Sequence, residues 1–309
     1  MVSLEWEKAN QGLKEMMKRS YRLSQVAGGS EGIEGIFARI ENLWVGKGEK
    51  EVHLDFYRAR APRATVVFQP GLGMYARVYA VLGGLLSREG YHFLAIDRPG
   101  HGLSPGPRGD CTVEEALAVT GEVIEFARQS FRLPVVLMGS GLGGILTFFS
   151  VLSGFSPELA IAHGVVYPGW YSGFRALGEI LSRFPERKIP IKWMTDFNHL
   201  TVDPVIREWV TREADPIIAW KVSGRFLASL IQFWIKQPPE DPVPLVIMAG
   251  TQDRLGWPVW SRMAIRSAGL RKVSLSMIPD AGHLLFHDHL DQSIPLLKKI
   301  INENLFRPA

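Results

Sequence analysis

The sequence predicts an α/β fold with a mostly parallel, doubly wound sheet, and three observations lead to that prediction. Short apolar runs alternate with helical patterns along most of the chain, which is typical of a parallel sheet covered by helices on both faces. Polar or glycine-rich loops follow several of these runs, where α/β proteins place their functional groups. With 309 residues, of which 46% are hydrophobic and 21% charged, the chain is long enough to bury a large core.

Residues 1–30 are predicted to form an N-terminal extension with one amphipathic helix. Apolar residues recur at helical spacing between residues 4 and 23, together with a basic set: Lys8, Lys14, Lys18, Arg19 and Arg22. We expect this helix to dock on the body of the protein. Contact with a membrane surface, which is not expected, and contact with a second copy of the chain are the alternatives. The glycine-rich stretch 27–32 then interrupts the helical pattern.

The first half of the core, within residues 31–168, shows regular alternation. The predicted strands are at 36–45, 51–58, 64–68, 92–96, 135–138 and 161–166, the first two forming an antiparallel pair. The predicted helices are at 76–88, from Thr112 to about 131, and from about 142 onward. Thr112 and Glu115 have the spacing of a capping box, which fixes where the second helix begins.

Between residues 169 and 239 the alternation stops. This stretch is rich in aromatic side chains and is predicted to be a helical cap inserted into the core. The alternation returns in 240–309, which completes the core. Its predicted elements are a strand at 244–249, a helix from 258, a strand at 272–278 and a helix ending near 304.

Composition limits the partners and the compartment. The net charge of +4 is mild and the basic residues are scattered, which argues against nucleic acid as a partner. Cys111 is the single cysteine, so an intrachain disulfide is excluded and a reducing, cytoplasmic setting is expected. No secretory signal is visible at the N-terminus. The uncharged stretch from Leu133 to Pro157 contains five glycines, which indicates a buried strand–helix unit and not a membrane span.

One stretch predicts where chemistry occurs. An apolar strand ending at Met138 passes through Gly139-Ser-Gly-Leu-Gly-Gly144 into an apolar helix, the context of a nucleophile elbow. The elbow pattern is Gly-x-nucleophile-x-Gly. The alignment that places glycines at both ends of this pattern puts Gly141, which has no side chain, at the nucleophile position. Ser140 lacks the flanking glycines, and strand alternation predicts that it faces away from the site served by position 141.

An acid and a histidine follow in the order that an elbow hydrolase requires. Asp253 comes directly after the strand at 244–249, and His283 lies on a glycine-containing loop after the strand at 272–278. We expect His283 to act as the general base and Asp253 to fix its tautomer. Competing residues are less well placed along the chain: His101, His287, His289, Asp97 and Asp241.

The same elbow predicts an oxyanion hole. Its backbone N–H donors are expected from Leu142, next to the nucleophile position, and from Leu72 in the glycine-containing turn after the strand at 64–68. Aromatic residues of the cap are candidates for contact with an apolar ligand: Trp170, Tyr171, Trp193 and Trp220. No metal and no cofactor is expected.

From about residue 50 to 300 the chain resembles the α/β-hydrolase superfamily, within it the monoacylglycerol lipase/lysophospholipase-like serine esterases. The resemblance rests on Pro70-Gly-Leu-Gly73 with Tyr79, Asp97-Arg-Pro-Gly-His-Gly-Leu-Ser104, Asp203-Pro, Ala214-Asp-Pro216, Gly250-Thr-Gln-Asp253-Arg and Ala281-Gly-His283. It implies hydrolysis of a small-molecule carboxylic ester, apolar or aromatic, through an acyl-enzyme. The oligomeric state remains open.

Gly141 departs from the pattern, because the family has serine there. Either the chain is an inactivated form of an esterase, or it is a natural non-catalytic relative that binds an apolar ligand under the cap. The retained acid, histidine and oxyanion turn favour the first. A third reading is a non-hydrolytic enzyme that uses His283 as a base. As written, the chain is expected to be nearly inactive.

Overall fold

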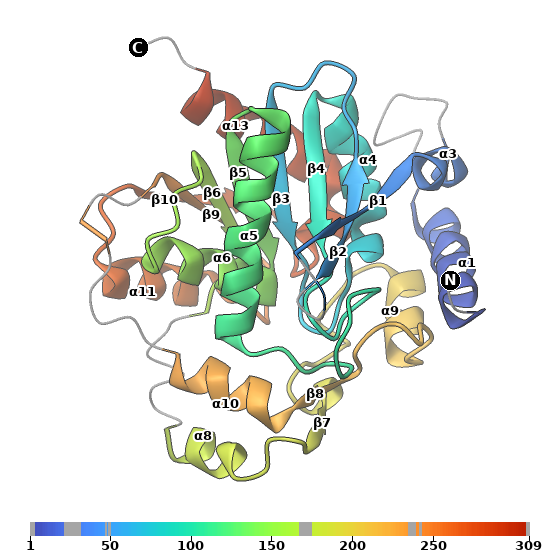
Figure 1. The fold of residues 1–309 in the computed structure, drawn as a ribbon, viewed down its shortest axis with the longest axis vertical. Coiled ribbons are helices and arrows are strands. Elements are labelled where there is room, and N and C mark those ends of the chain that lie inside the picture. The colour runs from blue at the N-terminus through green and yellow to red at the C-terminus, as the bar shows by residue number, and fades with distance from the viewer. Residues whose placement is uncertain are drawn as a thin grey trace.

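A computed structural model describes residues 4–21, 32–46, 48, 51–166, 175–233, 239–240 and 243–306. Its centre is an eight-stranded sheet with the strand order β1-β2-β4-β3-β5-β6-β9-β10 (Figure 1). The strands are β1 (Ile40–Val45), β2 (Val52–Tyr57), β3 (Ala64–Gln69), β4 (Tyr91–Ile96), β5 (Val135–Ser140), β6 (Leu159–His163), β9 (Leu245–Gly250) and β10 (Val273–Ile278).

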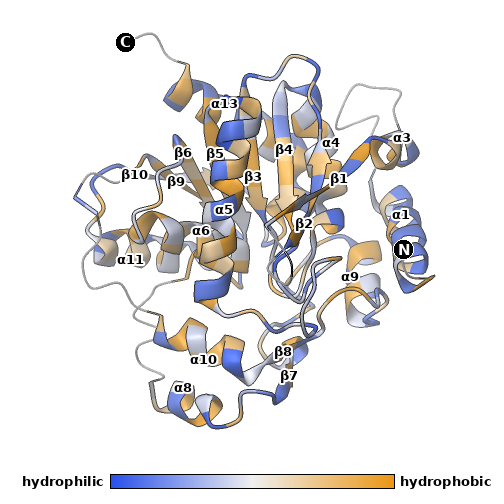
Figure 2. Cartoon of the chain, viewed as in Figure 1, coloured by the Kyte–Doolittle hydropathy of each residue, from blue (hydrophilic) through white to orange (hydrophobic). Residues whose placement is uncertain are grey.

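The sheet is parallel from β4 to β10, and β1 and β2 extend it with antiparallel pairing. Every residue of β3, β4, β5 and β6 is buried, as expected for strands covered on both faces. In Figure 2 these strands are mostly hydrophobic. The mostly parallel, doubly wound α/β fold predicted from the sequence is confirmed.

Helices cover both faces of the sheet. They are α1 (Leu4–Ser20), α3 (Ile33–Ala38), α4 (Ala80–Arg88) with the short η2 (Ala76–Tyr79) before it, α5 (Val113–Phe131), α6 (Leu142–Leu152), α11 (Pro258–Ala268), α12 (Leu285–Asp288) and α13 (Leu290–Leu305). Alternate residues of β3 enter different cores: Val66 packs with α1, α4 and α13, and Val67 packs with α5. Strand alternation produces this division, because successive side chains point to opposite faces.

The cap is not purely helical, which corrects the expectation for 169–239. It contains α8 (Arg175–Ser182), η3 (Ile191–Trp193), α9 (Pro204–Thr211) and α10 (Gly224–Gln232), but also a two-stranded antiparallel sheet of β7 (Lys188–Pro190) and β8 (Lys221–Ser223). The strands were missed because each has three residues, too few to show a period of two.

The predicted strand at 36–45 is also partly wrong. Residues 33–38 form α3, and β1 begins only at Ile40. Ile33, Ile36 and Phe37 are buried at helical spacing, so packing of this face selects a helical turn over an extended chain. Before it, α1 lies against the body and buries five residues: Trp6, Ala9, Leu13, Met16 and Met17. Among the described residues, no helix has the length and apolar character needed to cross a bilayer.

Candidate active site

The elbow lies between β5 and α6, where the chain turns sharply at Gly141. This residue has φ 55° and ψ −120°, a conformation that disfavours side chains. A Cβ at Gly139 would collide with the carbonyl oxygen of Gly143, and a Cβ at Gly143 would collide with that of Gln69. A Cβ at Gly144 would likewise collide with a neighbouring carbonyl, that of His163. Three of the four glycines are therefore required by close packing of the backbone.

Gly141 differs, because a side chain has room there. An added Cβ would lie 3.6 Å from Nε2 of His283 and 3.9 Å from Cα of Gly71, which are ordinary van der Waals distances. A side chain at this position would therefore project into the cavity towards the histidine.

The acid and the histidine are in contact. Nδ1 of His283 lies 2.9 Å from Oδ2 and 3.1 Å from Oδ1 of Asp253. The carboxylate also accepts hydrogen bonds from the backbone N–H groups of Leu255 (2.9 Å) and Gly256 (2.7 Å). This arrangement favours the tautomer with the proton on Nδ1, which leaves Nε2 facing position 141 as an acceptor.

Asp253 is held in its charged form. Burial opposes ionisation, but the imidazole of His163, 3.8 Å away, and the hydrogen bond from His283 outweigh it and hold the pKa of this carboxyl below its usual range. A buried carboxylate that remains charged is what stabilises an imidazolium next to it.

His163, at the end of β6, is a member of the site that the sequence analysis missed. It is fully buried, its Nε2 lies 3.8 Å from Oδ2 of Asp253, and its ring centre lies 5.3 Å from that of His283. Burial lowers its pKa and keeps it neutral. The sequence places His163 inside the strand predicted at 161–166, where a lone histidine carries little information about function.

Ser140 does not approach the place where a side chain at 141 would lie next to His283. Its Oγ lies 3.2 Å from Nδ1 of His163, on the neighbouring strand. It is 4% exposed and reaches the edge of the cavity, so it is more accessible than the strand alternation predicted.

The predicted oxyanion turn is fixed by two residues outside it. The guanidinium of Arg98 donates to the carbonyl oxygens of Pro70 (2.7 Å) and Gly71 (2.9 Å). The N–H of Gly71 donates to the Tyr79 hydroxyl at 3.1 Å. With its carbonyls engaged, the turn is held rigidly, and Leu72 and Leu142 both line the cavity.

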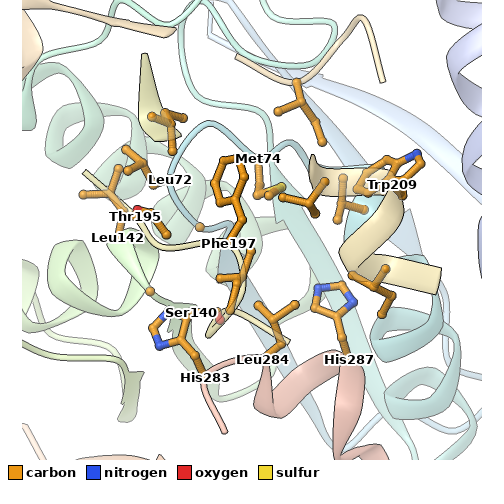
Figure 3. A pocket seen from close by; sticks show the side chains of 18 of the residues that line it. Leu72, Met74, Ser140, Leu142, Thr195, Phe197, Trp209, His283, Leu284 and His287 are labelled. Atoms are coloured by element: carbon orange, nitrogen blue, oxygen red, sulfur yellow. The ribbon is translucent and has the colours of Figure 1, made fainter. Parts of the chain in front are cut away.

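Two apolar lobes meet at Gly141, His283, Leu72 and Leu142. The first runs towards α9, and Figure 3 shows Trp209 of α9 on the opposite side of it from His283. Its lining is Met16, Met74, Val78, Phe197, Leu200, Ile206, Trp209, Val210, Ile218, Trp220, Leu284 and His287, among others. The second, more open lobe lies between the core and α8 and α10, and its lining includes Leu177, Leu181, Met194, Phe226 and Leu230.

The four aromatic candidates are placed differently. Trp220 lines the first lobe, and its Nε1 donates to the carbonyl oxygen of Asp215 at 2.7 Å. Trp193 is 73% exposed and does not line either lobe, so the structure does not support its predicted contact with a ligand. It ends the short η3, in which Ile191 is the residue that packs inward. Trp170 and Tyr171 lie outside the described residues.

Within the described part of the chain, one cluster has the composition of a metal site. The ligand atoms of His163, Asp253 and His283 all lie within 4.8 Å of one another. The hydrogen bonds between Asp253 and His283 already account for the proximity of these two residues, so no ion is needed to explain it. Cys111 is buried, and burial raises the pKa of its thiol to about 12, which makes it unreactive.

The chain is similar to known proteins over most of its length. Residues 60–289 match the model of the family described as serine aminopeptidase, S33. A monoacylglycerol lipase of Mycolicibacterium smegmatis is 23% identical over 273 residues, covering 81% of this chain and 92% of that protein.

Solved structures share the fold. A soluble variant of monoglyceride lipase from Saccharomyces cerevisiae, in complex with a substrate analog, aligns with a TM-score of 0.72 at 19% identity over 86% of this chain and 96% of its own. The hypothetical protein PA2218 from Pseudomonas aeruginosa aligns with a TM-score of 0.70 at 14% identity over 99% of both chains.

Proposed function

The chain belongs to the serine aminopeptidase S33 family of hydrolases, and on that basis we propose that its cavity binds a carboxylic ester and that Gly141 occupies the position of the nucleophile. The observation that carries the proposal is the room for a side chain at 141, directed at Nε2 of a histidine whose Nδ1 is held by Asp253. A nucleophile, a base and an acid need this order of contacts.

With a serine at position 141 the steps follow from this geometry. His283 takes the hydroxyl proton through Nε2 as the oxygen attacks the ester carbonyl, and Asp253 stabilises the imidazolium. The backbone N–H groups of Leu72 and Leu142 are the proposed donors to the oxyanion. The proton then passes from His283 to the leaving alcohol, and a water molecule hydrolyses the acyl-enzyme by the same route.

With glycine at this position the acyl-enzyme cannot form. Loss of a triad nucleophile reduces kcat by about 10⁶ and leaves about 10³ over the uncatalysed rate from binding and the oxyanion hole. The chain as it stands is therefore proposed to bind the ester and to turn it over barely or not at all.

The two lobes define the substrate class. Both are lined mainly by apolar side chains, and they diverge from the point where the ester carbonyl would sit. An ester with an apolar acyl group in one lobe and an apolar or aromatic alcohol in the other fills both, since apolar pockets select ligands by the surface they bury.

The test compares Gly141→Ser with Gly141→Ala, a control that adds the Cβ without the hydroxyl. Hydrolysis of short, medium and aromatic p-nitrophenyl esters and of monoacylglycerols is measured for both variants and for the unaltered chain. We expect the serine variant to exceed both others by several orders of magnitude. Equal, negligible rates in all three would contradict the proposal.

One alternative has a specific observation in its favour, namely Gly141 itself. A natural ligand-binding relative would have no use for a nucleophile, and the apolar lobes suit a bound lipid or aromatic molecule. That reading requires tight binding of an apolar ligand by the unaltered chain and no gain in turnover on introduction of serine.

A further inference from the structure

The N-terminal helix α1 contributes to the cavity although it lies outside the family match at 60–289. Met16 is the residue of α1 that lines the first lobe, and it is 5% exposed. Met17, its neighbour, is fully buried but does not line that lobe. A segment added to the family core thus supplies part of the wall of the proposed binding site.

The first half of α1 is anchored on a buried ionic group. The Trp6 ring packs edge-on against Tyr75 with 5.6 Å between ring centres, and the Arg77 guanidinium lies 5.0 Å from the centre of the Trp6 ring. Arg77 also donates to Asn10 at 3.2 Å, while its other nitrogens pair with Asp55 at 2.6 Å. These contacts fix the position of the helix along the surface of the core.

The second half of α1 is tied to the walls of the first lobe. The Tyr21 hydroxyl lies 2.7 Å from Nδ1 of His287, which lines the lobe. Ser20 Oγ donates at 2.6 Å to Asp203, and Asp203 in turn caps the N-terminus of α9. Since Ile206, Trp209 and Val210 of α9 also line the lobe, α1 and α9 form one connected wall.

This wall lies at the far end from the chemistry. In Figure 3, Trp209 and His283 are on opposite sides of the lobe, and in Figure 1 α1 lies beyond α9 on the outer side of the molecule. A chain bound with its carbonyl at Gly141 therefore extends towards α9 and α1.

We propose that α1 closes the end of the first lobe and that Met16 sets the longest acyl chain the site accepts. This inference rests on the proposed function, because it assumes that the acyl group of an ester occupies the first lobe. Each methylene buried in the lobe raises affinity about fourfold, and the gain stops when the chain reaches the wall. Methionine is unbranched and flexible, so its side chain adapts to the ligand beside it. Shortening it to alanine frees space in the lobe, and alanine favours the helix.

The experiment measures chain-length profiles in the complete protein. Binding of methyl esters of straight-chain carboxylic acids with six to eighteen carbons is measured by calorimetry in the unaltered chain. The kcat/KM of the p-nitrophenyl esters of the same acids is measured in Gly141→Ser. Each profile is repeated with Met16→Ala, with Met16→Phe and with the control Met17→Ala. Thermal unfolding of each variant verifies that it is folded.

The expected result is a shift in opposite directions. Met16→Ala should move the plateau of the profile up by about two carbons, because it removes three outer heavy atoms, and Met16→Phe should move it down. Met17→Ala, which costs stability at a buried site, should leave the plateau unchanged.

Three outcomes would contradict either the inference about Met16 or the proposed function. If esters bind and are hydrolysed with the same plateau in all variants, Met16 does not set the chain length. If Met17→Ala shifts the plateau as much as Met16→Ala, the effect is one of general packing and the inference fails. If no ester of any length binds or is hydrolysed, the proposed function itself is contradicted.

Discussion

The four glycines of the elbow fall into two groups with different physical reasons. At Gly139, Gly143 and Gly144 a single added carbon would overlap a neighbouring carbonyl, so the close approach of β5, α6 and the adjoining strands depends on having no side chain. At Gly141 the same carbon would meet nothing closer than 3.6 Å. Packing therefore requires glycine at three of these positions and does not explain the glycine at position 141.

The proposed function gives a reason for this difference between Gly141 and the other three glycines. The turn at Gly141 retains the positive φ that lifts a side chain off the backbone, and Asp253 and His283 remain in contact beside it. On the proposed function, only the nucleophile that would use this geometry is absent. The scaffold of a nucleophile is intact, which is why the predictions below are made on variants that complete or damage it.

The largest expected effect concerns the acid. In the Gly141→Ser background, Asp253→Asn should reduce kcat by about 10⁴, because the amide cannot hold His283 in the required tautomer. Steady-state hydrolysis of a p-nitrophenyl ester measures this. A loss below tenfold would mean that Asp253 is a structural carboxylate. Asp291→Asn, which changes an exposed acid in the first turn of α13, is the matched control.

The next effect compares two glycines directly. Gly143→Ala should cost more than about 4 kcal/mol of unfolding free energy because its Cβ would overlap the Gln69 carbonyl. Gly141→Ala should cost about 1–3 kcal/mol, the strain of a side chain at positive φ alone. Chemical denaturation of both variants measures the difference. Equal losses would remove the distinction between the two groups of glycines.

A smaller effect is expected at His163. In the Gly141→Ser background, His163→Ala should lower kcat/KM by about 10-fold, because it removes the buried imidazole that lies 3.8 Å from the Asp253 carboxylate and couples to it. Because His163 acts through Asp253, we also expect a shift in the acid limb of the pH–rate profile. His92→Ala, which removes a buried histidine away from the site, should leave that limb unchanged. If the acid limb of the pH–rate profile is unchanged in His163→Ala, His163 only packs against the site.

The smallest effect concerns stability at low pH. Burial lowers the pKa of His101 to about 3 and that of His287 to about 4, against 6.5 for an unperturbed histidine. Between each of these folded-state pKa values and 6.5, the unfolded chain therefore binds more protons than the folded chain. The unfolding free energy should fall as pH decreases below 6.5, by about 1.4 kcal/mol per pH unit for each histidine. The depressed pKa of Asp253 adds a loss below about pH 4. Denaturation from pH 7 to about 3 tests both losses, and His287→Gln should make the slope between pH 6.5 and 4 shallower.

Much of the fold followed from the sequence because parallel strands buried on both faces appear as short apolar runs. The acid and the histidine followed for a related reason: each comes directly after such a run, and strand ends share one edge of the sheet. The short strands β7 and β8 left no periodic signal. His163 and Met16 could not be assigned from the sequence, because each reaches the site through tertiary contacts between distant segments. Trp193 was misjudged because aromatic content does not reveal which side of a short helix faces the cavity.

The most direct test of the central claim is covalent labelling. A fluorophosphonate with an alkyl chain is incubated with the unaltered chain, with Gly141→Ser and with the double variant Gly141→Ser, His283→Ala, and intact mass and peptide mapping locate the adduct. The account predicts one phosphonyl group at position 141 in the serine variant, little or none in the double variant and none in the unaltered chain. Labelling of the unaltered chain at Ser140, or no labelling of the serine variant, would contradict it.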